Sequence, residues 1–232
     1  MTPMMEQYFE IKNQYKDFLL FYRLGDFYEM FFDDAIVASR VLELTLTGRD
    51  CGEAERAPMC GVPFHSAETY IATLIEKGYK VAICEQMENP ATAKGLVKRE
   101  VIRIITPGTV TEASMLPETR NNYLASVFID EGGAGVCFAD ISTAQIFATS
   151  FETTQYLPQL IGELGTYAPR EVLINLPHKL CPELVDFVKN RLNAVISDGD
   201  ASKYEYKSAA EAVRAQFSAT LRDGDLDKRR LI

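Results

Sequence analysis

Residues 19–29 read LLFYRLGDFYE, and this stretch decides how the amino-terminal part of the chain is interpreted. The apolar run at 18–24 predicts a buried β-strand, and the apolar residues of 27–43 return at helical spacing, which predicts a helix. The glycine of the motif would form the turn between them. On this interpretation Phe27 and Glu29 project together into whatever the turn faces.

A purely structural role is the alternative for this motif. Phe27 could be an ordinary core residue, and Glu29 could be an acidic residue of a first helical turn, which the helix dipole favours. Asp26 is a candidate cap for the helix, and Tyr28, on the face opposite Phe27, is expected in the core. A short motif is weak by itself, so the five residues alone do not choose between these interpretations.

Outward from the motif, helical and strand-like segments alternate and predict a mixed α/β domain over residues 1–110. Thr2 and Pro3 suit the start of a helix that extends to about Tyr15. Gly78 is a candidate helix C-cap. The other expected elements are a short strand near 44–47, a polar loop at 48–60, a helix at 66–77, and strands at 79–86 and 97–105.

Residues 111–122 show no apolar period and are expected to form a linker to a second domain at 123–232. Strand-like runs at 123–130, 135–141 and 145–151 are separated by short turns that suit antiparallel hairpins. A helix at 154–167, a strand at 171–176, a helix at 181–193 and a strand at 194–197 follow, with one more helical stretch from about 208. This order predicts a ribonuclease-H-like sheet.

The composition limits the classes of function. No run approaches the ~20 apolar residues of a membrane span, and the first residues lack the plan of a secretory signal. The five cysteines are scattered, with no CxxC, so a metal site is not expected and the thiols suit a cytoplasmic protein. The net charge of −9 taken alone argues against binding to nucleic acid.

Several motifs resemble, in order and spacing, the first two domains of the MutS family of DNA mismatch-repair proteins. They are TPMMEQY at 2–8, LLFYRLGDFYEMF at 19–31, DDA at 33–35, PMCGVPFH at 58–65, VAICEQ at 81–86 and RIITPGTV at 103–110. The resemblance is close to about residue 145 and looser beyond. It implies a mismatch-recognition domain followed by a connector domain with a ribonuclease-H-like fold.

The resemblance also implies the partners. These are mismatched double-stranded DNA, a MutL-type repair factor bound through the connector, and a second copy of the full-length protein. The location that it implies is the bacterial cytoplasm, at the nucleoid. Family members carry an ATPase domain that uses ATP and Mg²⁺ after these domains. The chain contains no GxxxxGK[ST] loop, which is the phosphate-binding motif of such a domain. We therefore expect that this chain is not an enzyme, that it needs no cofactor, and that it is part of a longer protein.

The resemblance assigns Phe27 and Glu29 to the mispaired base. An aromatic ring wedged from the minor groove replaces lost stacking, at an unstacking cost that is lowest where pairing is already broken. A carboxylate beside a polyanion is repelled unless it hydrogen-bonds the displaced base. Glu29 would therefore act partly by rejecting intact duplex.

Candidate contacts to the DNA backbone are few. They are Arg49, His65, Lys94 and Arg99, with Lys98 and Arg103 as further cations near the same segment. Each alone could be a solvated surface charge. The resemblance favours Arg49 and Arg99, whereas His65 could equally make a hydrogen bond within the fold.

Two other classes of function are compatible with the sequence. Ribonuclease-H-like enzymes hold two metal ions with clustered acids, so a metal-dependent nuclease is the alternative. The acids of the second domain show no evident convergence, which favours the fold without its chemistry. They are Asp130, Asp140, Glu163 and Glu171. A pure interaction module that docks the next repair factor is the third class.

Overall fold

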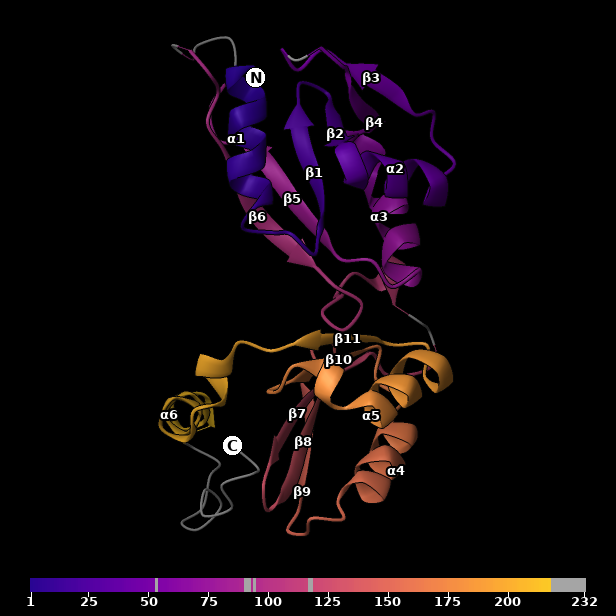
Figure 1. The fold of residues 1–232 in the computed structure, drawn as a ribbon, viewed down its shortest axis with the longest axis vertical. Coiled ribbons are helices and arrows are strands. Elements are labelled where there is room, and N and C mark those ends of the chain that lie inside the picture. Colours follow the sequence, from indigo (N-terminus) through magenta and orange to yellow (C-terminus); the bar gives the residue numbers. More distant parts are fainter. Residues whose placement is uncertain (53, 90–92, 94, 117–118, 218–232) are drawn as a thin grey trace. The chain divides into compact units, whose positions relative to one another are not determined.

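The structure is a computed structural model that describes residues 1–52, 54–89, 93, 95–116 and 119–217. The chain divides into two compact units, Met1–Thr106 and Pro107–Ile232. Each unit builds its own sheet and adds helices to it, so the predicted mixed α/β class is confirmed (Figure 1). Within the described residues, no helix is both long enough and apolar enough to cross a membrane.

The first unit contains a six-stranded sheet in the order β3-β4-β2-β1-β5-β6. β1 and β5 run parallel, and all other neighbouring strands are antiparallel. The strands are β1 (Leu19–Leu24), β2 (Phe27–Phe31), β3 (Thr47–Arg49), β4 (Ala57–Pro63), β5 (Val81–Gln86) and β6 (Arg99–Ile105). The helices are α1 (Pro3–Lys12), α2 (Phe32–Val41) and α3 (Ala67–Glu76).

Helix α1 covers one face of this sheet, and α2 and α3 lie on the other (Figure 1). Tyr8 of α1 packs edge-to-face on Tyr22 and Phe31, with ring centroids 5.5 and 5.1 Å apart. On the opposite face, the Cys60 thiol lies 3.5 Å from the Ala35 carbonyl oxygen of α2. Both faces of the central strands are therefore buried, which explains the continuous apolar run of β1.

The helix predicted at 27–43 is wrong at its beginning. Residues Phe27–Phe31 form strand β2, and the helix begins only at Phe32. Aromatic residues favour strands, and β2 gains pairing partners on both sides, from β1 and from β4. Phe32 takes a positive φ of 52°, an unusual backbone angle for a bulky residue, where the chain changes from strand to helix.

The polar loop predicted at 48–60 is also wrong in part. β3 includes Arg49, and β4 begins at Ala57, so the two strands form an antiparallel pair that the sequence did not indicate. Other boundaries differ by a few residues. Helix α1 ends at Lys12 instead of near Tyr15, and α3 begins at Ala67.

The second unit contains a five-stranded sheet in the order β11-β10-β7-β8-β9. β7, β8 and β9 are antiparallel, whereas β10 and β11 continue parallel to β7. This is the predicted ribonuclease-H-like arrangement. The strands are β7 (Tyr123–Asp130), β8 (Gly133–Asp140), β9 (Gln145–Phe151), β10 (Glu171–Ile174) and β11 (Val195–Asp198). The helices are α4 (Leu157–Tyr167), α5 (Pro182–Asp186), a π-helical turn at Phe187–Arg191 and α6 (Tyr206–Phe217).

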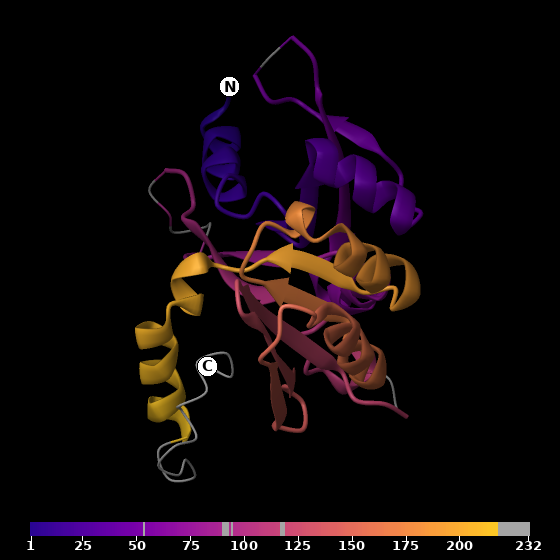
Figure 2. The ribbon, with the colours of Figure 1, turned by 60° about the horizontal axis from the view of Figure 1, so that its bottom comes forward.

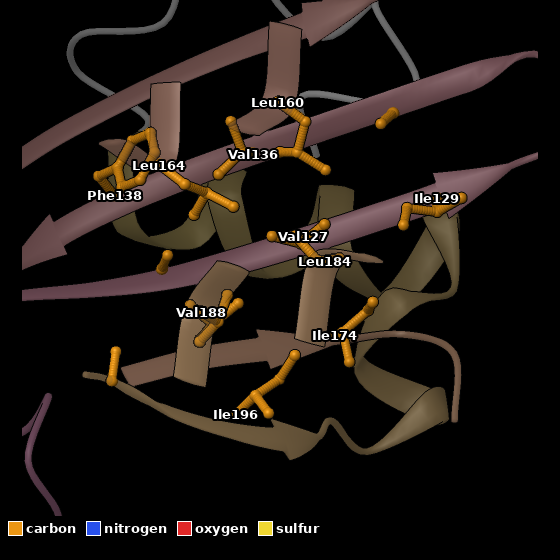
Figure 3. Packing of buried hydrophobic residues seen from close by; sticks show 14 residues of the cluster. Val127, Ile129, Val136, Phe138, Leu160, Leu164, Ile174, Leu184, Val188 and Ile196 are labelled. Carbon is orange, nitrogen blue, oxygen red and sulfur yellow. The ribbon is translucent and has the colours of Figure 1, made fainter. Parts of the chain in front are cut away.

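Helices α4 and α5 cover one face of this sheet (Figure 2). Leu160 and Leu164 of α4 and Leu184 of α5 join the buried valines and isoleucines of the strands in one core (Figure 3). On the other face, Tyr204 stacks on Phe128 at 6.4 Å between ring centroids. This sheet is therefore stabilised from both sides.

Asp140, at the end of β8, is buried with its carboxylate fully engaged. It accepts hydrogen bonds from the amide and hydroxyl of Ser142, from the side chain of Asn121 and from the amides of Asn122 and Thr143. Burial by itself would raise the pKa of this carboxyl, but these hydrogen bonds outweigh burial and lower the pKa. The ionised carboxylate is therefore a structural acceptor.

Replacing Asp140 with asparagine is expected to lower the free energy of unfolding at pH 7 by about 1–3 kcal/mol, because an amide cannot accept all these bonds. The pKa of the Asp140 carboxyl is lower in the folded protein than in the unfolded chain. The carboxylate therefore contributes stability above pH ~4, and this contribution is lost as the pH falls through the pKa of the folded protein. The stability of Asp140→Asn should therefore depend less on pH below about 4. Urea unfolding between pH 3 and 7 measures this, with exposed Glu131→Gln as control. Equal pH dependence in wild type and Asp140→Asn would contradict it.

Candidate nucleic-acid interface

The GDFYE motif forms the tip of a tight β-hairpin. Leu24 of β1 pairs directly with Phe27 of β2, so Gly25 and Asp26 alone make the loop. Gly25 takes a φ of 58°, which glycine adopts without strain and which suits the first position of a two-residue loop. The predicted cap role of Asp26 is wrong, since no helix begins there. Instead its carbonyl accepts a hydrogen bond from the Phe64 amide at 2.9 Å.

The alternation along β2 separates an exposed ring from a buried one. Phe27 is 46% exposed, whereas Tyr28 is 7% exposed and lies on the opposite face, as predicted. The Tyr28 hydroxyl is hydrogen-bonded to the Glu85 carboxylate. Burial, and then the nearby Glu85, raises the pKa of Tyr28 to about 12, so the hydroxyl remains a donor. Phe27 and Glu29 thus share one face of β2, beside each other at the hairpin end.

Arg23 fixes the hairpin tip to the neighbouring strands. Its Nε donates to the Gly25 carbonyl at 2.5 Å, and its Nη1 lies 3.3 Å from Oε1 of Glu85. Its guanidinium also stacks 3.6 Å over the ring of Phe64, just beyond the end of β4. Such cation–π contacts add to stability when they are partly desolvated. The position of Phe27 is therefore set by a network on the opposite face of its own strand.

Glu29 is paired with a cation. Its Oε2 lies 2.5 Å from Nη1 of Arg49, and the two side chains are 15% and 36% exposed. Gly61 of β4 lies directly opposite Glu29. A Cβ at Gly61 would come within 3.5 Å of Cγ of Glu29 and 3.3 Å of the Tyr28 carbonyl oxygen. A larger residue at position 61 would therefore press on the backbone of β2 and touch the Glu29 side chain.

The predicted backbone contacts are placed very differently from one another. Arg49 is partly exposed beside Glu29, and His65 is exposed next to Phe64. Lys94 lies outside the described residues. Arg99 disagrees with its predicted role, because it is only 7% exposed.

Arg99 makes its contacts inside the first unit. It donates to the Arg23 carbonyl at 2.8 Å, to the Gln7 side chain at 3.0 Å and to the Val97 carbonyl at 3.0 Å. Its guanidinium also lies 4.9 Å from the ring centroid of Tyr22. Since this guanidinium links β6 to β1 and α1, we assign it a structural role and leave it out of the interface. Lys98 is exposed but pairs with Glu100 at 2.5 Å.

Sequence reasoning missed Arg23, Phe64 and the pairing of Glu29 with Arg49. A hairpin interpretation of LGDFYE would have placed Arg23 opposite Tyr28, as the structure does. No short-range signal indicates the other two, since Phe64 and Arg49 come from segments that join β2 only through long-range pairing.

The acids of the second unit do not support a nuclease. Asp140 is occupied by the hydrogen bonds described above, Asp130 accepts from the amides of Gly132 and Gly133, and Glu171 is buried and accepts from the Gly108 amide. Among the described residues no group of three or more acidic, histidine or cysteine side chains could hold a metal ion. Nothing in this part of the chain favours the nuclease alternative.

Comparison with known proteins gives matches over both units. Family models for MutS domain I and MutS domain II match residues 2–114 and 122–227. The DNA mismatch repair protein MutS of Ruminiclostridium cellulolyticum is 51% identical over 93% of this chain and 25% of its own length. The protein of the same name from Acetivibrio thermocellus is 52% identical over 94% of this chain and 25% of its own length. The one from Clostridioides difficile is 57% identical over 75% of this chain and 18% of its own length.

The chain thus spans about a quarter of the length of the curated relatives it matches. The two family models together cover most of its residues, and the identity to several relatives is near one half. The chain belongs to the MutS family of DNA mismatch-repair proteins.

Proposed function

We propose that the first unit recognises mispaired bases in double-stranded DNA, with Phe27 as the wedge. The observation that carries this proposal is an aromatic ring, 46% exposed, at the end of a hairpin whose tip is tied down by Arg23 and Phe64. A large exposed ring on a rigid support is what insertion between bases requires. A mispaired step opens at lower cost than a paired one, so the ring would enter there preferentially.

In this proposal Glu29 supplies the second contact. The carboxylate is on the same face of β2 as Phe27 and would accept a hydrogen bond from a donor on the edge of the displaced base. An intact pair offers no such edge, and the phosphates repel the charge. Glu29 would thus discriminate by penalising matched duplex.

The remaining parts of the proposed interface are cationic. Arg49 is partly exposed and His65 is exposed on this unit, and both would contact the sugar–phosphate backbone, as would Lys94. We further propose, from family membership, that the second unit relays the bound state to an ATPase region and docks a MutL-type factor. The full-length protein would use ATP and Mg²⁺ as a homodimer in the bacterial cytoplasm at the nucleoid.

The proposal is tested in a full-length chimera, in which these 232 residues replace the matching amino-terminal part of the Ruminiclostridium cellulolyticum relative. Fluorescence anisotropy at physiological salt would compare a duplex containing one G·T mispair with the same duplex fully paired. Tighter binding of the mispaired duplex is expected. Equal affinity for both duplexes in a folded chimera would contradict the proposal.

The 232-residue chain by itself is expected to bind even mispaired duplex poorly at physiological salt. Its net charge is −9, and bending DNA by 40–90° costs on the order of 1–6 kcal/mol, which a few phosphate contacts cannot offset. Binding should become detectable at low salt and fall steeply as salt is added. Anisotropy titrations from about 20 to 200 mM salt measure this. Sub-micromolar, mismatch-selective binding at physiological salt would show that the first unit is self-sufficient.

A further inference from the structure

We infer that Arg49 is a specificity-determining residue, because it is the internal counter-ion that holds the Glu29 carboxylate until a DNA phosphate takes the guanidinium away. This inference rests on the proposed function and adds a role for the ion pair. A plain backbone contact would strengthen matched and mispaired binding alike. If Arg49 must leave Glu29 in order to bind a phosphate, then the phosphate contact depends on whether Glu29 finds a hydrogen-bond partner on the base.

The Glu29–Arg49 ion pair depends on the order of the strands in the sheet. Glu29 is on β2 and Arg49 on β3, and β4 lies between them, so the two side chains meet across an intervening strand. Their register partners on β4 are Gly61 and Ala57. These are small residues, and even a Cβ at Gly61 would be in van der Waals contact with Cγ of Glu29, at 3.5 Å. The small residues at these two positions of β4, on either side of Met59, leave room for the guanidinium and the carboxylate to meet at 2.5 Å.

The burial of the two groups is unequal, and this asymmetry sets the direction of the exchange. Arg49 is 36% exposed and can turn towards a phosphate, whereas Glu29 is 15% exposed and stays where β2 places it. Guanidinium groups bind phosphates and carboxylates with the same forked geometry, so a phosphate is a direct competitor for Arg49.

The exchange leaves Glu29 as a half-buried carboxylate without its counter-ion and close to a polyanion. Removing one partner from a desolvated ion pair is costly, because the other charge remains. A mispaired base with a free edge can replace the lost hydrogen bonds, and a paired base cannot. When Arg49 binds a phosphate at a normal base pair, the unpaired Glu29 carboxylate would therefore lower the affinity for the duplex.

Three other predicted cations, Arg99, Lys98 and His65, have different partners. Arg99 is bound to backbone carbonyls and Gln7, Lys98 pairs with Glu100, and His65 packs edge-to-face against Phe64. Arg49, by contrast, is paired with a proposed base contact. The inference therefore applies to this residue.

A double-mutant cycle tests the exchange. Wild type, Glu29→Gln, Arg49→Ala and the double variant of the 232-residue chain would be titrated with fully paired duplex at low salt, by anisotropy. With Glu29 present, Arg49→Ala loses a phosphate contact but also removes the need to break the pair. In the Glu29→Gln background it loses the phosphate contact alone. Arg49→Ala should therefore weaken binding more in that background, by about fivefold, which is the upper range for a partly exposed ion pair.

The matched control is Arg40→Ala, an exposed cation on α2, beyond the opposite face of the sheet. It should have the same small effect in both backgrounds, and melting temperatures of all variants confirm folding. Equal fold-changes for Arg49→Ala in the two backgrounds would overturn the inference, as would no gain in affinity for Glu29→Gln. If the chimera still loses mismatch preference on Phe27→Ala, the proposed function survives that failure. If the chimera shows no preference at all, the proposed function itself fails.

Discussion

Replacing Phe27 with alanine in the full-length chimera is expected to remove most of its preference for mispaired duplex. Stacking of an aromatic side chain on a base contributes about 1–3 kcal/mol, which corresponds to roughly 5- to 150-fold in affinity. The loss should fall on mispaired duplex, since only there does the ring enter the stack. The measurement is the ratio of dissociation constants for G·T and fully paired duplexes, by anisotropy at physiological salt.

The fold should tolerate this change, because Phe27 is 46% exposed and its truncation opens no buried cavity. Phe147→Ala is a matched control, because that ring is 42% exposed on the second unit and outside the proposed interface. It should leave the preference unchanged. A large fall in melting temperature for Phe27→Ala in the 232-residue chain would show that the ring supports the fold, and the wedge role would have to be abandoned.

Glu29→Gln is expected to act in the opposite direction on paired duplex. The substitution removes a charge that the phosphates repel and frees Arg49 from its ion pair, so binding to paired duplex should tighten. Binding to mispaired duplex should change less, because the amide retains both donor and acceptor groups for the base. The preference should therefore narrow several-fold in the chimera.

The same titrations decide this prediction. Glu29→Ala provides a second variant, which removes both the charge and the hydrogen bond. If either substitution weakens paired and mispaired binding equally, Glu29 is a structural residue of β2 and the rejection argument fails.

The tip of the first sheet shows where sequence reasoning reached its limit. The strand β1 and the exposure of Phe27 could be predicted from the apolar run and the glycine turn. The segment after the turn has apolar residues that fit both a helix and a buried strand, and such short runs are ambiguous. Pairing with β4, which comes much later in the chain, decides for the strand. A pattern within residues 27–43 cannot indicate this pairing, because β4 lies outside that segment.

Charged residues were harder to place than apolar ones. Arg49 and Arg99 look alike as sequence positions, each at the end of a strand. One lies on the surface beside Glu29, and the other is buried over Tyr22 with three hydrogen bonds. The difference arises from strand order, which places β6 and β3 at opposite edges of the sheet, and from α1, whose Gln7 binds Arg99. In the second unit, by contrast, short turns between successive strands determine the antiparallel hairpins, so local patterns sufficed.

The central claim is that Phe27 contacts the mispaired base, and photo-crosslinking tests it most directly. The full-length chimera would be irradiated on a duplex in which 5-iodouracil replaces thymine at a G·T mispair, and the crosslinked peptide would be identified by mass spectrometry. The fully paired duplex, with 5-iodouracil opposite adenine, is the control. We expect a crosslink at Phe27 on the mispaired duplex and a much weaker one on the control. A crosslink confined to other residues, or one at Phe27 of equal yield on both duplexes, would contradict the account.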